Sequence, residues 1–418
     1  MLTAQDIRNR FMAKFNLTEE IIQQGTLTTS GGGTYISANP NHDTAIKPFY
    51  VTVESIDDFK AFGGNSDEHY ANNTLQEHHE ALAEWDASKN EKAYSELSVL
   101  EKSAVCSAYQ TYIYGNSSKV KSYKAVLQKH FFPAQLAVCA GQDVVVTPGN
   151  PLILAGDGDN PITYSFNTIT IQPGGQIISQ ANATLLVDTL IQEEGGTQLG
   201  DTQPTNSFVS IGADGQSGAA GGNGGNGNPG SQGSAGSDGK NSCDTQAGQG
   251  GTGGTGNPGT QGGNGSRGSD SQVVKATLTV VQGPISLMSC GGNGGAGGVG
   301  GNAGAGGVGG TGGSSTSHCS AGAQGKGGQG GNGADGGSGG DSGNGQNIYC
   351  TYQSLGPNGS ISLGVPTKGQ GGQGGAAGNG GNGGQGNPNG GGGTAGSPGA
   401  NGKNGTNGTV YINNVPQQ

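Results

Sequence analysis

The chain has 418 residues, of which 91 are glycine, while aromatic residues make up 5% and charged residues 11%. Disordered proteins usually combine few apolar residues with high net charge, and this chain is poor in both apolar bulk and charge. Its net charge of −11 argues against nucleic acid or an anionic membrane as the main partner.

Residues 1–135 are ordinary in composition and are predicted to be mainly helical with a small β element. The segment AQDIRNRFMAKF places its apolar residues on one helical face, and NLTEEIIQQG is predicted to be a second helix that ends at Gly25. One strand is predicted in KPFYVTVESIDDF, followed by a long helical pattern over residues 73–132. Trp85 is expected in the core of this zone.

The first residues, MLTAQDIRNRFMAKF, carry charges and lack the apolar stretch of a secretory signal, and no run of ~18 apolar residues indicates a membrane span. We therefore expect synthesis in the cytoplasm without a signal peptide and action outside the cell or on a virion or other particle. Residues 1–135 are expected to attach the protein to a fibre or to further copies of itself.

The cluster Glu77-His78-His79-Glu80 is the main candidate for a metal site in this zone. Adjacent histidines on a helix point to different faces, and no HxxxH or HExxH spacing is present. A solvated helical face is the favoured interpretation, so no metal and no cofactor is expected.

Six cysteines lack any CxxC pair, and cytosolic synthesis favours free thiols. Four of them lie where glycine-rich runs meet ordinary sequence, which leaves pairing after release open. These four are Cys243, Cys290, Cys319 and Cys350.

Residues 136–211 change to an alternating β pattern and are predicted to form a β-rich connector. VVVTPGNPLIL at 144–154 and ITIQPGGQIIS at 169–179 align with an offset of 25 residues, each reading strand, tight turn, strand. A repeat of this length fits one coil of a β-solenoid, and a pair of ordinary hairpins fits almost as well.

Residues 212–418 are the glycine zone, in which glycine keeps a period of three over long runs. The backbone that repeats every three residues at low cost is the polyproline II helix, whose N–H and C=O groups need partners on other segments. Collagen would require more than the 16 prolines present. A bundle of polyglycine II helices, interleaved with strands, is therefore predicted. Its structural glycines include Gly292, Gly295, Gly298, Gly301, Gly304, Gly307 and Gly310.

The glycine content of each run predicts its place in the bundle. GGX runs at 291–313 and 327–341 are expected inside, whereas SQGSAGSDG and AGSPGANGKNG are expected at the edge. Turns are predicted at GNPG 227–230, GNPG 256–259 and GNPN 386–389. Strand pairs are predicted within VVKATLTVVQGPISLMS and NIYCTYQSLGPNGSISLGV.

The phased GGX runs after a non-glycine N-terminal zone resemble the glycine-rich tip adhesin of the long tail fibres of T-even-like phages. That resemblance covers about half of the chain and implies an attachment domain, a polyglycine II domain and distal loops that bind the bacterial surface. The runs also resemble the glycine-rich antifreeze protein of snow fleas, a bare polyglycine II bundle.

The candidate binding residues lie in the breaks between glycine runs, SSTSHCSAGAQ and NIYCTYQS. They are His318, Tyr349 and Tyr352, residue types that are scarce in this zone. Rigid scaffolds commonly present recognition loops, and aromatic rings suit contacts with sugars or a partner protein. The leading hypothesis is a non-enzymatic adhesin that presents loops to a cell-surface receptor or glycan.

Two further hypotheses remain open from sequence. One is a toxin or self-assembling particle component that acts at a membrane through its helical zone. The other is an ice-binding protein whose exposed Asn, Thr and Ala side chains order water. No catalytic motif supports an enzyme.

Overall fold

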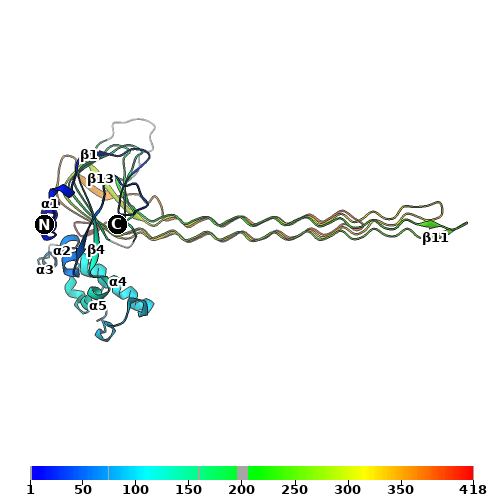
Figure 1. The fold of residues 1–418 in the computed structure, drawn as a ribbon, viewed down its shortest axis with the longest axis horizontal. Helices are drawn as coiled ribbons and strands as arrows, with labels where there is room; N and C mark the ends of the chain where they lie inside the picture. The colour runs from blue at the N-terminus through cyan, green and yellow to red at the C-terminus, as the bar shows by residue number, and fades with distance from the viewer. Residues whose placement is uncertain (1, 74, 159–160, 195–205, 418) are drawn as a thin grey trace.

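The computed structural model describes residues 2–73, 75–158, 161–194 and 206–417. The fold is mixed α/β, with two large sheets and few helices. Figure 1 shows a body of strands, a cluster of helices against one side of that body, and a long thin rod that projects from it. No described helix is both long enough and apolar enough to cross a membrane.

Two sheets of mainly parallel strands form the body. The large sheet has the order β1-β4-β6-β8-β12-β14-β16-β17, with β3 also paired to β4. Its strands are β1 (Gln23–Thr28), β3 (Phe49–Val53), β4 (Ala134–Val146), β6 (Ile162–Ile171), β8 (Ala183–Gln192), β12 (Val274–Gln282), β14 (Ile348–Leu355), β16 (Val410–Ile412) and β17 (Val415–Gln417).

The small sheet has the order β15-β13-β9-β7-β5-β2. Its strands are β2 (Thr34–Ser37), β5 (Leu152–Ala155), β7 (Ile177–Ser179), β9 (Phe208–Ile211), β13 (Pro284–Cys290) and β15 (Ser360–Leu363). The chain alternates between the sheets, so a pair such as β4 and β5 makes one coil of the body.

The strand register distinguishes between the coil and the hairpin interpretations. β4 pairs in parallel with β6, with Val144 opposite Ile169, and β5 pairs in parallel with β7, with Leu152 opposite Ile177. Both pairs keep the 25-residue offset seen in the sequence. The turn between β6 and β7 contains Gly174 at φ 84°, which glycine adopts without strain. The two segments are therefore successive coils, and the hairpin alternative is wrong.

The body draws strands from all three sequence zones. β1 and β2 come from residues 1–135, and β12 to β17 come from residues 212–418. The predicted ranges therefore do not fold as three separate bodies, because strands with a glycine run inserted between them still complete one pair of sheets.

A single apolar core fills the space between the two sheets. Alternate residues of each strand point inward, so Tyr164 and Phe166 of β6 are fully buried there together with Val187 of β8. The same core continues through Leu278 and Cys350 of the later coils. Packing between the sheets thus joins coils that are far apart in sequence.

The helices cover the outer face of the large sheet. They are α1 (Ala4–Lys14), α2 (Ile56–Gly63), α3 (Asp67–Ala71), α4 (Val99–Tyr114) and α5 (Lys124–Phe131), with short 3-10 turns Glu19–Ile21, Ala87–Lys89, Tyr94–Glu96 and Ser117–Tyr123. Phe11 of α1 and Trp85 are buried in a second apolar cluster beneath these helices, as predicted. Arg8 of α1 contacts the sheet through Asp188 at 3.0 Å.

Two helix predictions in this zone are wrong. Residues 73–86 contain no helix in their described part, and the segment is attached mainly through the buried side chains of Leu75 and Trp85. The predicted helix ending at Gly25 is instead a 3-10 turn followed by β1, whose backbone pairs with β4. Pairing with a neighbouring strand outweighs the local helix preference in that segment.

Six glycine runs make up the rod within the described residues. We number them run 1 (212–236), run 2 (248–271), run 3 (291–313), run 4 (322–345), run 5 (371–386) and run 6 (390–408). Each odd run leaves the small sheet and the following even run returns to the large sheet, so three hairpins are inserted at the same corner of successive coils.

Backbone hydrogen bonds at every third residue hold the runs side by side. Gly215 N donates to Asn293 O at 2.8 Å and Gly218 N to Ala296 O at 2.8 Å, and this spacing recurs between all neighbouring runs. Runs 3 and 4 each bond to four others, runs 2 and 5 to three, and runs 1 and 6 to two. The runs with the most glycine therefore have the most neighbours.

The two GNPG segments do not form turns. Gly227 N donates to Ala305 O and Gly230 N to Val308 O, both at 2.8 Å, so run 1 continues through its GNPG segment, and run 2 does the same over 256–259. Proline has a fixed φ near the value of a polyproline II helix, which has three residues per turn, so proline is compatible with an uninterrupted run. The predicted turn at 386–389 is present.

Asparagine and aspartate side chains accept hydrogen bonds from backbone N–H groups at the surface of the rod. Asn223 Oδ1 accepts from Asn302 N at 2.9 Å, and Asn302 Oδ1 in turn accepts from Asn379 N at 2.8 Å. Residues with this role recur on most runs, and another is Asp341, which accepts from Lys403 N at 2.7 Å. The frequent Asn of the GGN triplets thus completes the hydrogen bonding of the adjacent run.

Candidate functional site

The far end of the rod is built by two loops, residues 237–247 between runs 1 and 2 and residues 314–321 between runs 3 and 4 (Figure 1). The first contains a short hairpin of β10 (Ser237–Asp238) and β11 (Cys243–Thr245). The third hairpin, runs 5 and 6, is shorter. Its turn lies beside run 4, where Asn387 N donates to Gly325 O at 2.9 Å. We call the two long loops the tip.

A disulfide joins the two tip loops, between Cys243 and Cys319. The sequence favoured free thiols at these positions, and that expectation is wrong for this pair. The other four cysteines are free: Cys139, Cys290 and Cys350 are buried and Cys106 is exposed. Both bonded cysteines lie in breaks between glycine runs, and this placement is the sequence feature that left their pairing open.

Asp238 holds the second loop in place. Its carboxylate accepts hydrogen bonds from the Thr316 hydroxyl, from Ser317 N at 3.0 Å and from His318 N at 3.1 Å. These bonds, the Thr316 hydroxyl first, lower the pKa of Asp238 below its ordinary value. The ionised carboxylate is thus the form that these hydrogen bonds favour. Sequence reasoning missed Asp238 because a single aspartate carries no motif.

The exposed side chains of the tip are small, polar or charged. His318 lies on the second loop with its side chain exposed, and Lys240, Asn241 and Asp244 are exposed on the first. Of the three candidate binding residues, His318 is the one that lies at the tip. The tip can therefore offer hydrogen bonds and both signs of charge to a partner.

Tyr349 and Tyr352 lie in β14, at the body, and their assignment to a loop is wrong. Tyr349 is buried on the outer face of the large sheet, where its ring stacks on Tyr114 at 4.9 Å and on Tyr411 at 5.1 Å between ring centroids. Burial raises its pKa. Tyr352 points inward and packs against the core between the sheets. Both tyrosines therefore stabilise the body.

The histidine pair predicted on a solvated helical face is instead packed against those tyrosines. His78 stacks on Tyr411 at 3.9 Å, and the His79 ring bonds to Glu77 at 2.8 Å through Nδ1 and to Tyr349 Oη at 3.3 Å through Nε2. Among the described residues, no group of three or more His, Cys, Asp or Glu side chains could hold a metal ion. The cluster joins the helices to the late strands.

The structural glycines lie where neighbouring runs touch. A Cβ at Gly292, Gly295, Gly298, Gly301, Gly304, Gly307 or Gly310 would be 1.9–2.0 Å from a backbone oxygen of run 1. Such distances are far inside van der Waals contact, so no larger residue fits without separating the runs.

No family model matches the chain, and neither does any curated protein. Among solved structures, one similar chain is described as the nine polyproline type II helical bundle springtail antifreeze protein from Granisotoma rainieri, whose crystal waters match the ice lattice. It is 28% identical over 46% of this chain and 93% of that chain, with a TM-score of 0.07.

Proposed function

We propose that the protein is a non-enzymatic surface-recognition protein, an adhesin whose tip loops bind a receptor or glycan on a cell surface. The single observation that carries this proposal is the tip itself. Two loops from separate hairpins are joined by the Cys243–Cys319 disulfide and by the hydrogen bonds of Asp238, at the end of a long rod. Loops ordered before binding lose less entropy when a partner binds.

The rod acts as a rigid spacer in this proposal, and its runs are polyglycine II helices. Lateral bonding at every third residue and glycine at each close approach support that geometry. At ~3.1 Å per residue, residues 212–236 would extend over roughly 75 Å. Such a spacer places the tip well clear of a body that is mounted on a fibre or particle through the helices and the first coils.

Binding of the full chain to intact cells or to an array of surface glycans tests the proposal. The tip variants His318→Ala and Lys240→Ala are compared with Lys326→Ala, which removes an exposed lysine from the side of run 4. We expect a tip variant to weaken binding at least tenfold, about 1.4 kcal/mol, and the run 4 variant to bind as the wild type does. Unchanged binding by both tip variants, with binding lost on changes to the helices, would refute the tip assignment.

Two further measurements on the full chain separate the two other hypotheses. Ice binding requires side chains that are available to water, whereas the oxygens of Asn223 and Asn302 already accept backbone hydrogen bonds. Thermal hysteresis in the absence of cell binding would favour that function nevertheless. Leakage of liposomes caused by the full chain would favour action at a membrane.

A further inference from the structure

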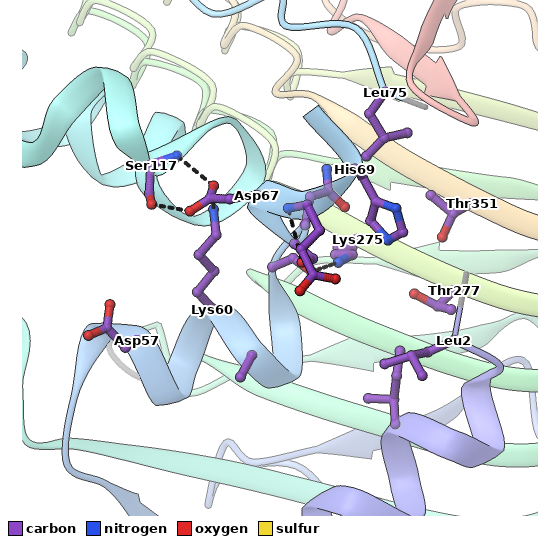
Figure 2. A pocket seen from close by; sticks show the side chains of 16 residues that line it. Leu2, Asp57, Lys60, Asp67, His69, Leu75, Ser117, Lys275, Thr277 and Thr351 are labelled. Carbon is purple, nitrogen blue, oxygen red and sulfur yellow. Dashed lines mark hydrogen bonds and ion pairs between the residues drawn. The ribbon is translucent and has the colours of Figure 1, made fainter. Parts of the chain in front are cut away.

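A cleft of about 340 Å³ lies between the helices and the outer face of the large sheet. Figure 2 shows Lys275, Thr277 and Thr351 on the strands, with Lys60 and His69 on the helices across from them. Its volume is at the lower end of the range for small-molecule sites. The cleft is at the body, remote from the tip, and the proposed function makes no use of it.

Lys275 is the most unusual residue of this cleft. It is the second residue of β12, with only 5% of its surface exposed. Its ammonium donates to the carbonyl oxygen of Gly64, at the end of α2, and this is its one hydrogen-bond acceptor among the described residues. An ammonium has three N–H donors, so the Gly64 carbonyl satisfies only part of its capacity.

Three carboxylates line the cleft, and two of them are already paired with other cations, while Glu68 of α3 is in no salt bridge among the described residues. Asp67 pairs with Lys60 at 3.0 Å, and Asp57 pairs with Lys124. Within the described part of the chain, no carboxylate lies in salt-bridge contact with Lys275. Lys275 is therefore a buried cation that has no counter-ion at this cleft.

A buried cation without a counter-ion is costly, and proteins usually neutralise it or pair it with an anion. Burial first, and then the positive charge of Lys60, lower the pKa of Lys275 to about 7. An anion that entered the cleft would remove this cost, because it would supply the missing charge next to the ammonium.

We propose that the cleft binds a small monocarboxylate, with its carboxylate against Lys275. A single negative charge balances one ammonium, whereas a dianion would add an unpaired negative charge close to Asp67 and Glu68 of α3. The hydroxyl of Thr277 lies on the same face of the sheet and can donate to the second carboxylate oxygen. The neighbouring Thr351 hydroxyl already donates to Ala276 O at 3.4 Å.

The remainder of the ligand would lie against the apolar part of the cleft, which includes Leu2, Ile7 and Leu75. A short aliphatic or aromatic tail fits such a lining. The carboxylate can belong to a free small acid or to the C-terminus of a partner polypeptide, since both present the same group.

Competitive acetylation of the full chain, mapped by mass spectrometry at pH 6.5, where Lys275 is mainly the ammonium, tests the proposal with butyrate as the probe. Chloride at equal ionic strength is the reference, and the exposed amine of Lys326 is the internal control. If butyrate binds with a Kd near 1 mM, a concentration of 20 mM lowers the acetylation rate of Lys275 roughly 20-fold and leaves Lys326 unchanged.

Two variants separate binding from a purely structural role of the Lys275–Gly64 contact. Lys275→Met removes the charge and should abolish butyrate binding by calorimetry in a folded protein, since an apolar replacement of a buried charge is tolerated. Ala61→Trp narrows the cleft from the exposed side of α2 and should abolish protection while Lys275 stays in place.

A peptide with a free C-terminus and its amidated form distinguish the two sources of the carboxylate. Protection by butyrate and by the free peptide indicates a site open to small acids, and protection by the free peptide alone indicates a partner's C-terminus. Equal acetylation of Lys275 in butyrate, free peptide and chloride would overturn the proposal, as would protection that persists in Ala61→Trp. Equal binding by the amidated peptide would also overturn it.

Discussion

Replacing Gly301 with alanine tests whether glycine is required in the rod for its size. A Cβ at this position would be 2.0 Å from the carbonyl oxygen of Gly222, more than 1 Å inside ordinary van der Waals contact. Gly301 N also donates to Thr260 O at 2.9 Å, so run 3 is held against both runs of the first hairpin. The added methyl group therefore cannot be accommodated unless runs 1 and 3 separate.

The cost follows from the bonds that such a separation breaks. Gly221 N donates to Val299 O and Gly224 N to Asn302 O, each at 2.8 Å, on either side of the clash. At ~0.5–1.5 kcal/mol for each bond, with some overpacking, the loss is about 2–4 kcal/mol. Differential scanning calorimetry of the full chain should show it as a lower melting temperature of the transition assigned to the rod.

Two matched variants make the result interpretable. Gly225→Ala places its Cβ 3.5 Å from the nearest atom, Asn257 Nδ2, so we expect it to be neutral or to stabilise by about 0.4–1 kcal/mol through a less flexible unfolded chain. Val299→Thr alters a side chain that is 50% exposed and should change stability by less than ~0.5 kcal/mol. Equal destabilisation by Gly301→Ala and Gly225→Ala would refute the role assigned to glycine size.

Three further outcomes are expected. Cys243→Ser combined with Cys319→Ser should speed amide exchange and proteolysis in the tip loops and leave the melting of the rod unchanged, because the runs are bonded independently of the disulfide. Burial lowers the pKa of His78, so below pH ~6.5 the unfolded chain binds more protons than the folded chain and the body should lose stability. His78→Phe should reduce this pH dependence of the melting temperature. Asn302→Ala leaves Asn379 N without its side-chain acceptor and should cost at most ~1 kcal/mol by calorimetry, with Asn302→Asp close to wild type.

The period of three could be predicted from sequence because it is imposed at short range. Each close approach leaves no room for a Cβ, so glycine recurs wherever one run faces another, and runs 3 and 4 need it on more faces than runs 1 and 6 do. The 25-residue offset was visible for a similar reason, because stacked coils put equivalent side chains in one core.

The predictions from sequence are wrong where distant segments determine the local structure. The helical pattern around His78 is outweighed by contacts with a stack of rings from residues 114, 349 and 411, which are far away in sequence. Tyr349 looked like a loop residue because glycine runs flank its segment, yet the strand pairs with β12 and β16. The importance of Asp238 and Lys275 depends on neighbours that no local pattern reveals.

The sheets also determine how the runs of the rod align. Ile211 of β9 pairs with Cys290 of β13, and the next bond, from Gly212 N to Cys290 O, continues that ladder directly into runs 1 and 3. On the return side, Val274 of β12 pairs with Ile348 of β14, next to runs 2 and 4. Each hairpin is therefore anchored at both of its ends by strands that pair in register. This pairing fixes the register in which the glycine runs align. Since glycine repeats are nearly identical along a run, they could slip by a triplet at little cost, and the body removes that freedom. The position of the tip thus depends on the register of strands at the opposite end of the molecule.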